Sequence, residues 1–309
     1  MACLKEIINS GLPTCVLKPG VLDGAIFAPT YDANKNLNAI LDTDVLNAAF
    51  FADKVSKATP KDQRWYPVDA SSVEDVNYTE DDPISQTFSS GRIEVLDNGA
   101  VNISFLVVDV PPSYKQFFEK TVKGQDISIY IPDSEGQLMG KVSADGTKFL
   151  PLKINKGSVN VKFTPKNLVN TQTNQLEVTF QLNKSEQSES FEVLAVDGVD
   201  FTTLTGMLDV DATVSAITTT TFTVDTKLKY NRFAGDLKLE GRVLADWALF
   251  NDTDTAFITI TTATEQVSST GVYDFVIPTQ DSADVLRLSL TDNTANVNFE
   301  LTTTTILIP

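Results

Sequence analysis

Short runs of β-branched and alternating apolar residues, separated by turn residues, recur through most of this 309-residue chain. They are most regular from about residue 206 onward, where threonine becomes frequent and Pro and Lys become scarce. About seven short strands within about 100 residues form the pattern of an immunoglobulin-like sandwich. Trp247, on the third run, suits a buried core aromatic, and the region has no cysteine pair of the antibody type. We therefore expect a mainly β chain in which residues 206–309 form an immunoglobulin-like β-sandwich.

The residues before this region, 1–205, predict a separate β domain with an N-terminal extension. Residues 1–35 are expected to be loop because Gly and Pro interrupt them regularly. Apolar residues at helical spacing within 36–57 predict one or two short helices. Several strands are expected between residues 126 and 182, and they are separated by turns such as Asp145-Gly146. The domain boundary is placed near residue 205 by the change in composition.

An acidic and mostly polar stretch covers residues 67–90. A long connection of this kind inside a compact domain is uncommon unless it has a role. One interpretation is a solvated surface loop. The other is an arm that reaches a neighbouring subunit, because apolar side chains remain among the charges. The candidate inter-subunit residues are Glu74, Asp75, Tyr78, Glu80, Asp81, Asp82 and Phe88.

A β-hairpin is predicted around Asn98-Gly99, between the apolar runs 91–97 and 100–110. Asn-Gly is preferred in a type I′ turn because both central residues need a positive φ. A short helix is expected next, with Ser113 as its N-cap and Gly124 at its end. The apolar stripe of this helix, which should cover one sheet, consists of Tyr114, Phe117, Phe118 and Val122.

The composition leaves little room for common catalytic chemistry. The chain has no histidine, which is the usual general base and metal ligand near neutral pH. Cys3 and Cys15 could form one bridge but are too few for a zinc site or a disulfide framework. The scarcity of Trp and Tyr argues against a paired-carboxylate glycosidase site. Four aspartates, which could donate oxygens to calcium but match no known calcium loop, are better read as loop carboxylates: Asp209, Asp211, Asp252 and Asp254. We expect no enzyme activity, cofactor or metal.

The surface charge is strongly negative, since 41 acidic residues oppose 24 basic ones for a net charge of −17. Such a surface repels phosphate backbones and anionic lipid, so direct nucleic-acid or membrane binding is disfavoured. A negative surface is useful, by contrast, in a protein wall along which DNA must slide without adhering. The first fifteen residues lack the features of a signal peptide, and no segment approaches the roughly 18 apolar residues of a membrane span. We expect a soluble protein made in a cytoplasm.

The order of features between residues 60 and 182 resembles the tail tube (major tail) proteins of long-tailed phages. Trp65-Tyr66-Pro67-Val68 precedes the acidic stretch, and the predicted hairpin and short helix follow it. The segment DISIYIPDSEGQLMGKVSADGTKFLPLKI then looks like the strand–turn–strand unit of such subunits. Residues 206–309 are similar to the immunoglobulin-like domains that phages append to tail and capsid proteins, which also occur in bacterial surface proteins.

The resemblance implies a tail-tube-like β-sandwich or barrel with a short flanking helix. It also implies self-assembly into hexameric rings, which stack into a tube located in the virion tail. In that arrangement the 67–90 loop would reach the adjacent ring, and acidic groups facing the lumen would let DNA pass without specific binding. The C-terminal domain would decorate the exterior, and other tail proteins would be partners.

Other functions fit parts of the same pattern. One alternative is another virion component, such as a head–tail connector, a baseplate ring or a decoration protein. A different alternative is a bacterial surface module that binds glycans through the immunoglobulin-like sandwich. A carboxylate-based enzyme fits least well.

Overall fold

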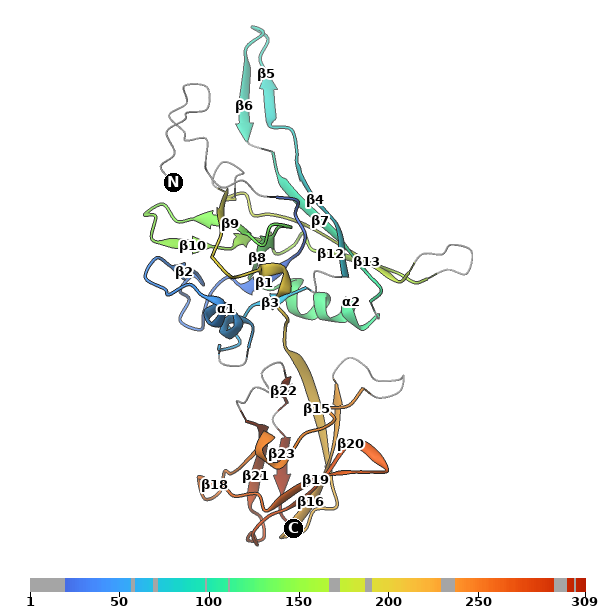
Figure 1. Cartoon of the computed structure of the whole chain (residues 1–309). Helices are drawn as coiled ribbons and strands as arrows, with labels where there is room; N and C mark the ends of the chain where they lie inside the picture. Colours follow the sequence, from blue (N-terminus) through green and yellow to red (C-terminus); the bar gives the residue numbers. More distant parts are fainter. Residues whose placement is uncertain are drawn as a thin grey trace. The chain divides into compact units, whose positions relative to one another are not determined.

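A computed structural model describes residues 20–56, 59–68, 72–97, 99–110, 112–166, 173–186, 191–228, 237–291, 299–302 and 304–309. The chain is mainly β with a few short helices, as the sequence predicts (Figure 1). It divides into two compact units. The first comprises residues 1–55 and 61–205, and the second comprises 206–309 with residues 56–60. Cys3 and Cys15 lie outside the described residues.

The first unit has two larger sheets that share one buried cluster, and a second buried cluster lies between the larger of these sheets and the helix at residues 48–55. One sheet has the strand order β2-β10-β9-β8-β1-β3, with β11 beside β8 and β14 beside β9. The other, which we call the four-stranded sheet, has the order β12-β13-β7-β4. Every second residue of β7 is buried, so one face of the four-stranded sheet covers the core. The strands are β1 (Ile26–Pro29), β2 (Ile40–Leu41), β3 (Tyr66–Pro67), β4 (Val73–Glu80), β7 (Val101–Val108), β8 (Ile127–Pro132), β9 (Leu138–Val142), β10 (Lys148–Leu150), β11 (Leu152–Lys153), β12 (Asn160–Thr164), β13 (Gln175–Gln181) and β14 (Phe191–Leu194).

Aromatic rings connect the two sheets. The Phe27 ring on β1 lies 6.2 Å from the Phe105 ring on β7 and 6.2 Å from the Phe180 ring on β13. Phe118, which follows a short helix, packs edge-on against Phe27 at 5.6 Å. All four side chains are buried, so this cluster joins both sheets to the flanking helix.

The prediction of a continuous loop over residues 1–35 is wrong within its described part. Strand β1 lies between β8 and β3, and its residues Ile26, Phe27 and Ala28 are fully buried. A strand that is buried on both faces shows no alternation, and this one is only four residues long. The helix expected within 36–57 is present as α1 (Ala48–Val55). Its Phe51 packs edge-on against Phe201, which belongs to the 3₁₀ helix Phe201–Thr203.

The second unit is a two-sheet sandwich with the strand order of an immunoglobulin fold. One sheet runs β19-β20-β16-β15-β22 and the other β18-β17-β21-β23. Strands β15, β16, β20 and β19 take the places of A, B, E and D, and β18, β17, β21 and β23 those of C′, C, F and G. Trp247 on β17 is buried against Tyr273 and Phe275, as predicted. The elements are β15 (Leu208–Ser215), β16 (Thr221–Leu228), a 3₁₀ helix (Leu244–Asp246), β17 (Trp247–Asn251), β18 (Ala256–Ile258), β19 (Thr262–Gln266), β20 (Ser269–Val276), β21 (Val285–Leu290), β22 (Phe299–Leu301) and β23 (Thr304–Leu307).

Candidate assembly surface

The acidic stretch predicted as a loop forms strands of a long two-stranded ribbon. Strand β4 pairs with β7, and beyond them β5 (Ile84–Thr87) pairs with β6 (Ile93–Asp97). We call residues 84–97 the arm. Figure 1 shows β5 and β6 extending away from the four-stranded sheet of the first unit. The loop prediction for 67–90 is therefore wrong, although the alternative of an extended arm describes the geometry of residues 84–90.

The base of the ribbon contains a β-bulge at the acidic residues. The β4–β7 register shifts between Glu74 and Asn77, and Asp75 adopts a φ of 53°. The Asn77 amide donates a hydrogen bond to the Asp75 carbonyl at 3.0 Å, which supports the bulged backbone. Glu74 and Asp75 are exposed. Tyr78 instead packs edge-on against Phe191 of the same unit, at 6.1 Å, so it is part of the subunit's own packing.

The ribbon is interrupted once, at a joint formed by residues 81–83 and 99–100. The β4–β7 ladder ends with the Asp81 amide donating to the Ala100 carbonyl at 2.9 Å, and pairing resumes at Ile84 and Asp97. Gly99 packs so closely against the Asp81 carbonyl that a Cβ atom would overlap it. Pro83 has no amide hydrogen, which suits a break in the ladder.

The predicted hairpin turn at Asn98-Gly99 is wrong. Gly99 lies midway along the ribbon, because β6 pairs with β5 and β7 pairs with β4; Asn98 lies outside the described residues. The reversal occurs at the arm tip, where the Phe88 amide donates to the Arg92 carbonyl at 2.8 Å. Gly91 there has a φ of 80°, a conformation that glycine adopts without strain. The Ser-Ser-Gly sequence at 89–91 was the available signal for this turn.

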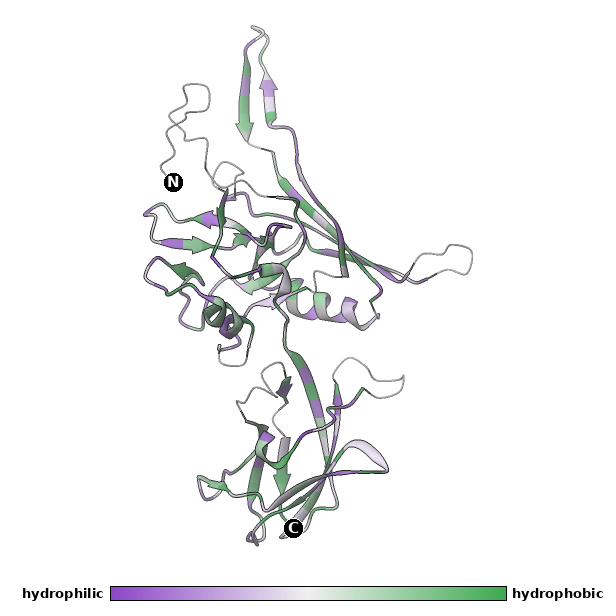
Figure 2. Ribbon diagram, in the orientation of Figure 1, coloured by the Kyte–Doolittle hydropathy of each residue, from purple (hydrophilic) through white to green (hydrophobic). Residues whose placement is uncertain are grey.

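The arm has two different faces. Ile93 and Val95 share one face with their cross-strand partners Thr87 and Ser85, and 66% of Ile93 and 59% of Val95 is exposed. Figure 2 shows hydrophobic residues along β6. The opposite face is mixed, because alternation along the strands places the exposed Ile84, Phe88 and Leu96 there together with polar residues. Its polar contacts are the Gln86–Glu94 pair, the Arg92–Glu94 ion pair at 2.9 Å, and the Arg92 guanidinium 5.5 Å from the Phe88 ring centre.

A pocket of about 130 Å³ lies at the joint, lined by Asp81 and Asp82 of the ribbon and by the residues after β13. Among the latter, the Glu186 side chain is fully buried and accepts a 2.7 Å ion-pair contact from Lys141 on β9. The second Glu186 carboxylate oxygen, Oε2, is buried and meets no hydrogen-bond donor from the residues that the structure describes. The acidic residues of the joint thus border a small pocket with a buried carboxylate.

The outer face of the four-stranded sheet is polar and mostly uncharged. Amide and hydroxyl side chains dominate the middle of this face, around a shallow depression of about 380 Å³. The two outer strands of the sheet, β4 and β12, have hydrogen-bonded partners on one side only among the described residues. The depression is lined by Thr79, Asn102, Ile103, Ser104, Ser158, Thr179, Phe180 and Gln181.

The short helix predicted after the hairpin is present as α2 (Ser113–Phe117), which continues as the π-helix Phe118–Val122. Pro112 takes the N-cap position in place of Ser113, with no side-chain cap. Phe118 and Val122 are buried in the core, but Tyr114 is exposed, so its assignment to the packed stripe is wrong. The Phe117 side chain lies outside the described part of the chain. The change to π-helical geometry at Phe118 alters the side-chain spacing that the prediction assumed.

The described residues offer no metal centre, because no group of three or more Asp, Glu or Cys side chains among them could hold an ion. Of the aspartates considered for calcium, Asp252 pairs with Arg287 at 2.9 Å and Asp254 accepts a hydrogen bond from Asn251. None of the helices formed by described residues has the length and apolar character needed to cross a membrane.

Comparison with known proteins assigns no family. A scan against protein-family models gives no match, and a search of curated proteins gives none.

Proposed function

We propose that this chain is a non-enzymatic virion structural protein that assembles with copies of itself into hexameric rings, and that the rings stack into a tail tube conducting DNA. The observation that carries the proposal is the arm, a projecting ribbon whose apolar face is exposed in the single subunit. The hexameric ring and the stacked tube are inferred from the resemblance of the sequence to phage tail tube proteins.

The arm needs a further surface to pack against, on physical grounds. A two-stranded ribbon is only marginally stable alone in water and usually needs a surface to pack against. Exposed apolar side chains on such a ribbon mark a site of protein–protein contact. Ile93 and Val95 on one face, with Ile84 and Leu96 near the joint, provide that contact surface. In the proposed tube the arm reaches the adjacent ring.

The open sheet edges support ring formation within one layer. No described strand pairs with the outer sides of β4 and β12, and such edges are a hazard unless another chain or element covers them. A cyclic, heterologous ring satisfies both edges of every subunit at once.

The composition of the sheet's outer face supports passage of DNA without adhesion. Asn102, Ser104, Thr179 and Gln181 supply neutral amides and hydroxyls there, and Lys162 on β12 lies opposite the acidic Glu177 on β13. A lumen lined by this face has no basic cluster that would hold a phosphate backbone. The remaining negative charge of the protein adds repulsion.

The immunoglobulin-like unit suits an exterior position, because its core is closed between its own two sheets. Trp247, Tyr273 and Phe275 fill that core without help from another chain. The unit therefore needs no neighbouring copy to bury its apolar residues.

The direct test is the assembly state of the purified full chain, measured by sedimentation velocity and negative-stain microscopy over a range of concentrations. Stacked rings or filaments are expected. A chain that stays monomeric at the highest soluble concentration overturns the proposal. Isolated rings that never stack support the second candidate, a connector or baseplate ring.

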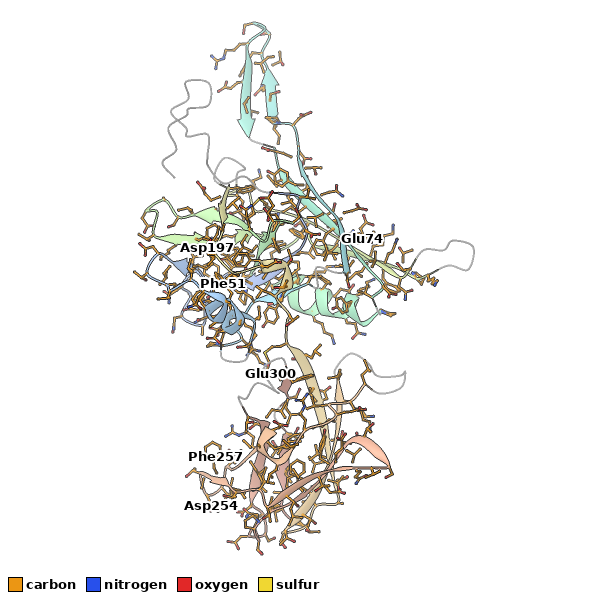
Figure 3. All side chains as sticks on the ribbon, viewed as in Figure 1. Phe51, Glu74, Asp197, Asp254, Phe257 and Glu300 are labelled. Atoms are coloured by element: carbon orange, nitrogen blue, oxygen red, sulfur yellow. The ribbon has the colours of Figure 1, made fainter. Side chains whose placement is uncertain are left out.

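One observation favours a glycan-binding surface module as a third candidate. Phe257 on β18, labelled in Figure 3, is 78% exposed and lies 5.1 Å from the Phe250 ring. The Arg287 guanidinium, which pairs with Asp252, lies 5.2 Å from the centre of the same Phe250 ring. An exposed ring next to paired polar groups can stack on a sugar. A glycan array with the full chain tests this candidate, which predicts binding by a monomer.

A further inference from the structure

The two open edges of the four-stranded sheet carry opposite charge. Strand β4 has three acidic residues and no basic one, and its end leads directly into Asp81 and Asp82. Strand β12 has Lys162 and no acidic residue, and Lys156 and Lys166 flank it. Figure 3 marks Glu74 on β4. The acidic edge and the basic edge belong to one sheet.

The side chains concerned point to the same face of that sheet. Glu74 pairs with Leu106 of β7, on the outer face, and the exposed residues of β12 are Asn160, Lys162 and Thr164. Within the described part of the subunit, Lys162 makes one weak ion pair, with Glu177 at 3.9 Å, and both side chains of this pair are largely exposed. Lys162 is therefore available to a carboxylate on a neighbouring strand.

The strand directions fit the same pairing. All three ladders of the sheet are antiparallel, so the first and last of its four strands run in opposite directions. When copies are related by rotation about a ring axis, β4 of one copy therefore meets β12 of the next in antiparallel orientation. The sheet then continues across the boundary in the antiparallel pattern, except at the β4 bulge between Glu74 and Asn77, where the ladder is irregular.

The alternative contacts bring like charges together. A two-fold β4–β4 contact would place Glu74 and Asp75 of one copy beside the same residues of the other. A two-fold β12–β12 contact would do the same with Lys162. Like charges on directly opposed strand positions are destabilising, whereas opposite charges stabilise the pair.

We propose that the acidic β4 edge of one copy pairs with the basic β12 edge of the next, and that this charge complementarity selects a cyclic ring over a two-fold dimer. The inference rests on the proposed self-assembly and names the two surfaces that meet within a ring. The occupant of each edge is a second copy of this chain, since one molecule carries both complementary edges.

The test uses the full chain with Glu74→Lys, with Lys162→Glu, and with both substitutions together. Each single variant brings like charges to the boundary and is expected to raise the concentration needed for ring formation about tenfold. The double variant exchanges the signs of the two edges, so its threshold should return to within about threefold of the wild type. Added salt should reduce the defect of the single variants.

Two matched controls change charge at exposed positions away from the edges, namely Asp42→Lys and Lys120→Glu, and both should assemble normally. Far-UV circular dichroism verifies that each variant is folded. Single variants that assemble like the wild type, or a double variant that is not rescued, overturn the edge pairing while leaving self-assembly itself in place. A wild-type chain that never assembles overturns the proposed function instead.

Discussion

Gly99 lies directly against the backbone carbonyl of Asp81, where the β4–β7 pairing of the four-stranded sheet ends and the β5–β6 pairing of the arm begins. Only a residue without a Cβ atom allows the two chains to approach so closely. The contact fixes the start of the arm at the end of β4. The arm therefore extends the four-stranded sheet and is not attached to it through a free loop. Gly99 thus serves close packing of the two chains of the ribbon.

Substitution of Gly99 by Ala should disturb this joint. The added methyl group overlaps the Asp81 carbonyl, and forced overlap of this kind costs about 1–3 kcal/mol. We expect a lower free energy of unfolding for the first unit and faster proteolysis within the arm. Gly157→Ala is the matched control, because a Cβ atom at Gly157 meets open space. Equal stability and equal proteolysis of the two variants would contradict the role given to Gly99.

The apolar face of the arm should be needed for assembly but not for folding. Ile93→Ser with Val95→Ser removes two exposed apolar side chains, so stability should change by no more than about 0.5 kcal/mol. Loss of the area that they bury between copies should raise the assembly threshold at least about tenfold, as sedimentation velocity would measure. Gln86→Ala, on the opposite face, is the control and should assemble normally. Unimpaired assembly of the double variant speaks against the arm as a contact surface.

The buried ion pair beside the arm joint predicts a non-additive result. Lys141→Met leaves the Glu186 carboxylate buried without its cation, and removing one partner of such a pair costs about 3–5 kcal/mol. Lys141→Met combined with Glu186→Leu removes both charges, so most of that loss should be recovered. Denaturant unfolding of the first unit measures both effects. A double variant as unstable as the single one would mean that packing, not charge, dominates at this position.

The turn between β9 and β10 predicts a perturbed titration. The Ser143 hydroxyl and then the Thr147 backbone amide donate hydrogen bonds to Asp145, and they lower its pKa from 3.8 to about 2. Because the folded pKa is lowered, the ionised carboxylate stabilises the folded state above about pH 4, and this contribution is lost as the pH falls through about 2. Ser143→Ala should raise the pKa toward 3.8, as an NMR titration of the Asp145 carboxyl would show. An unchanged pKa would assign the shift to the backbone and side-chain hydrogen bonds from Thr147.

Two Gly-containing pairs show where local sequence preference succeeded and where it failed. Asp145-Gly146 was predicted as a turn, and Gly146 has a φ of 73° in the tight connection between β9 and β10. Asn98-Gly99 has an even stronger turn preference, yet Gly99 lies within the ribbon. The preference was overridden because β7 pairs with β4 and not with β6. Strand pairing over long sequence distances is set by core packing, which local patterns do not encode.

The mainly β character and the buried Trp247 could be read from residue patterns, because alternation and β-branched runs reflect the face that each strand turns to the core. Strand β1 could not be read in this way, since a short strand buried on both faces has no alternation to detect. The arm and the two oppositely charged edges could not be read either. Both depend on which strand becomes the neighbour of which, and that choice is made when distant segments pack together around Phe27 and Phe118.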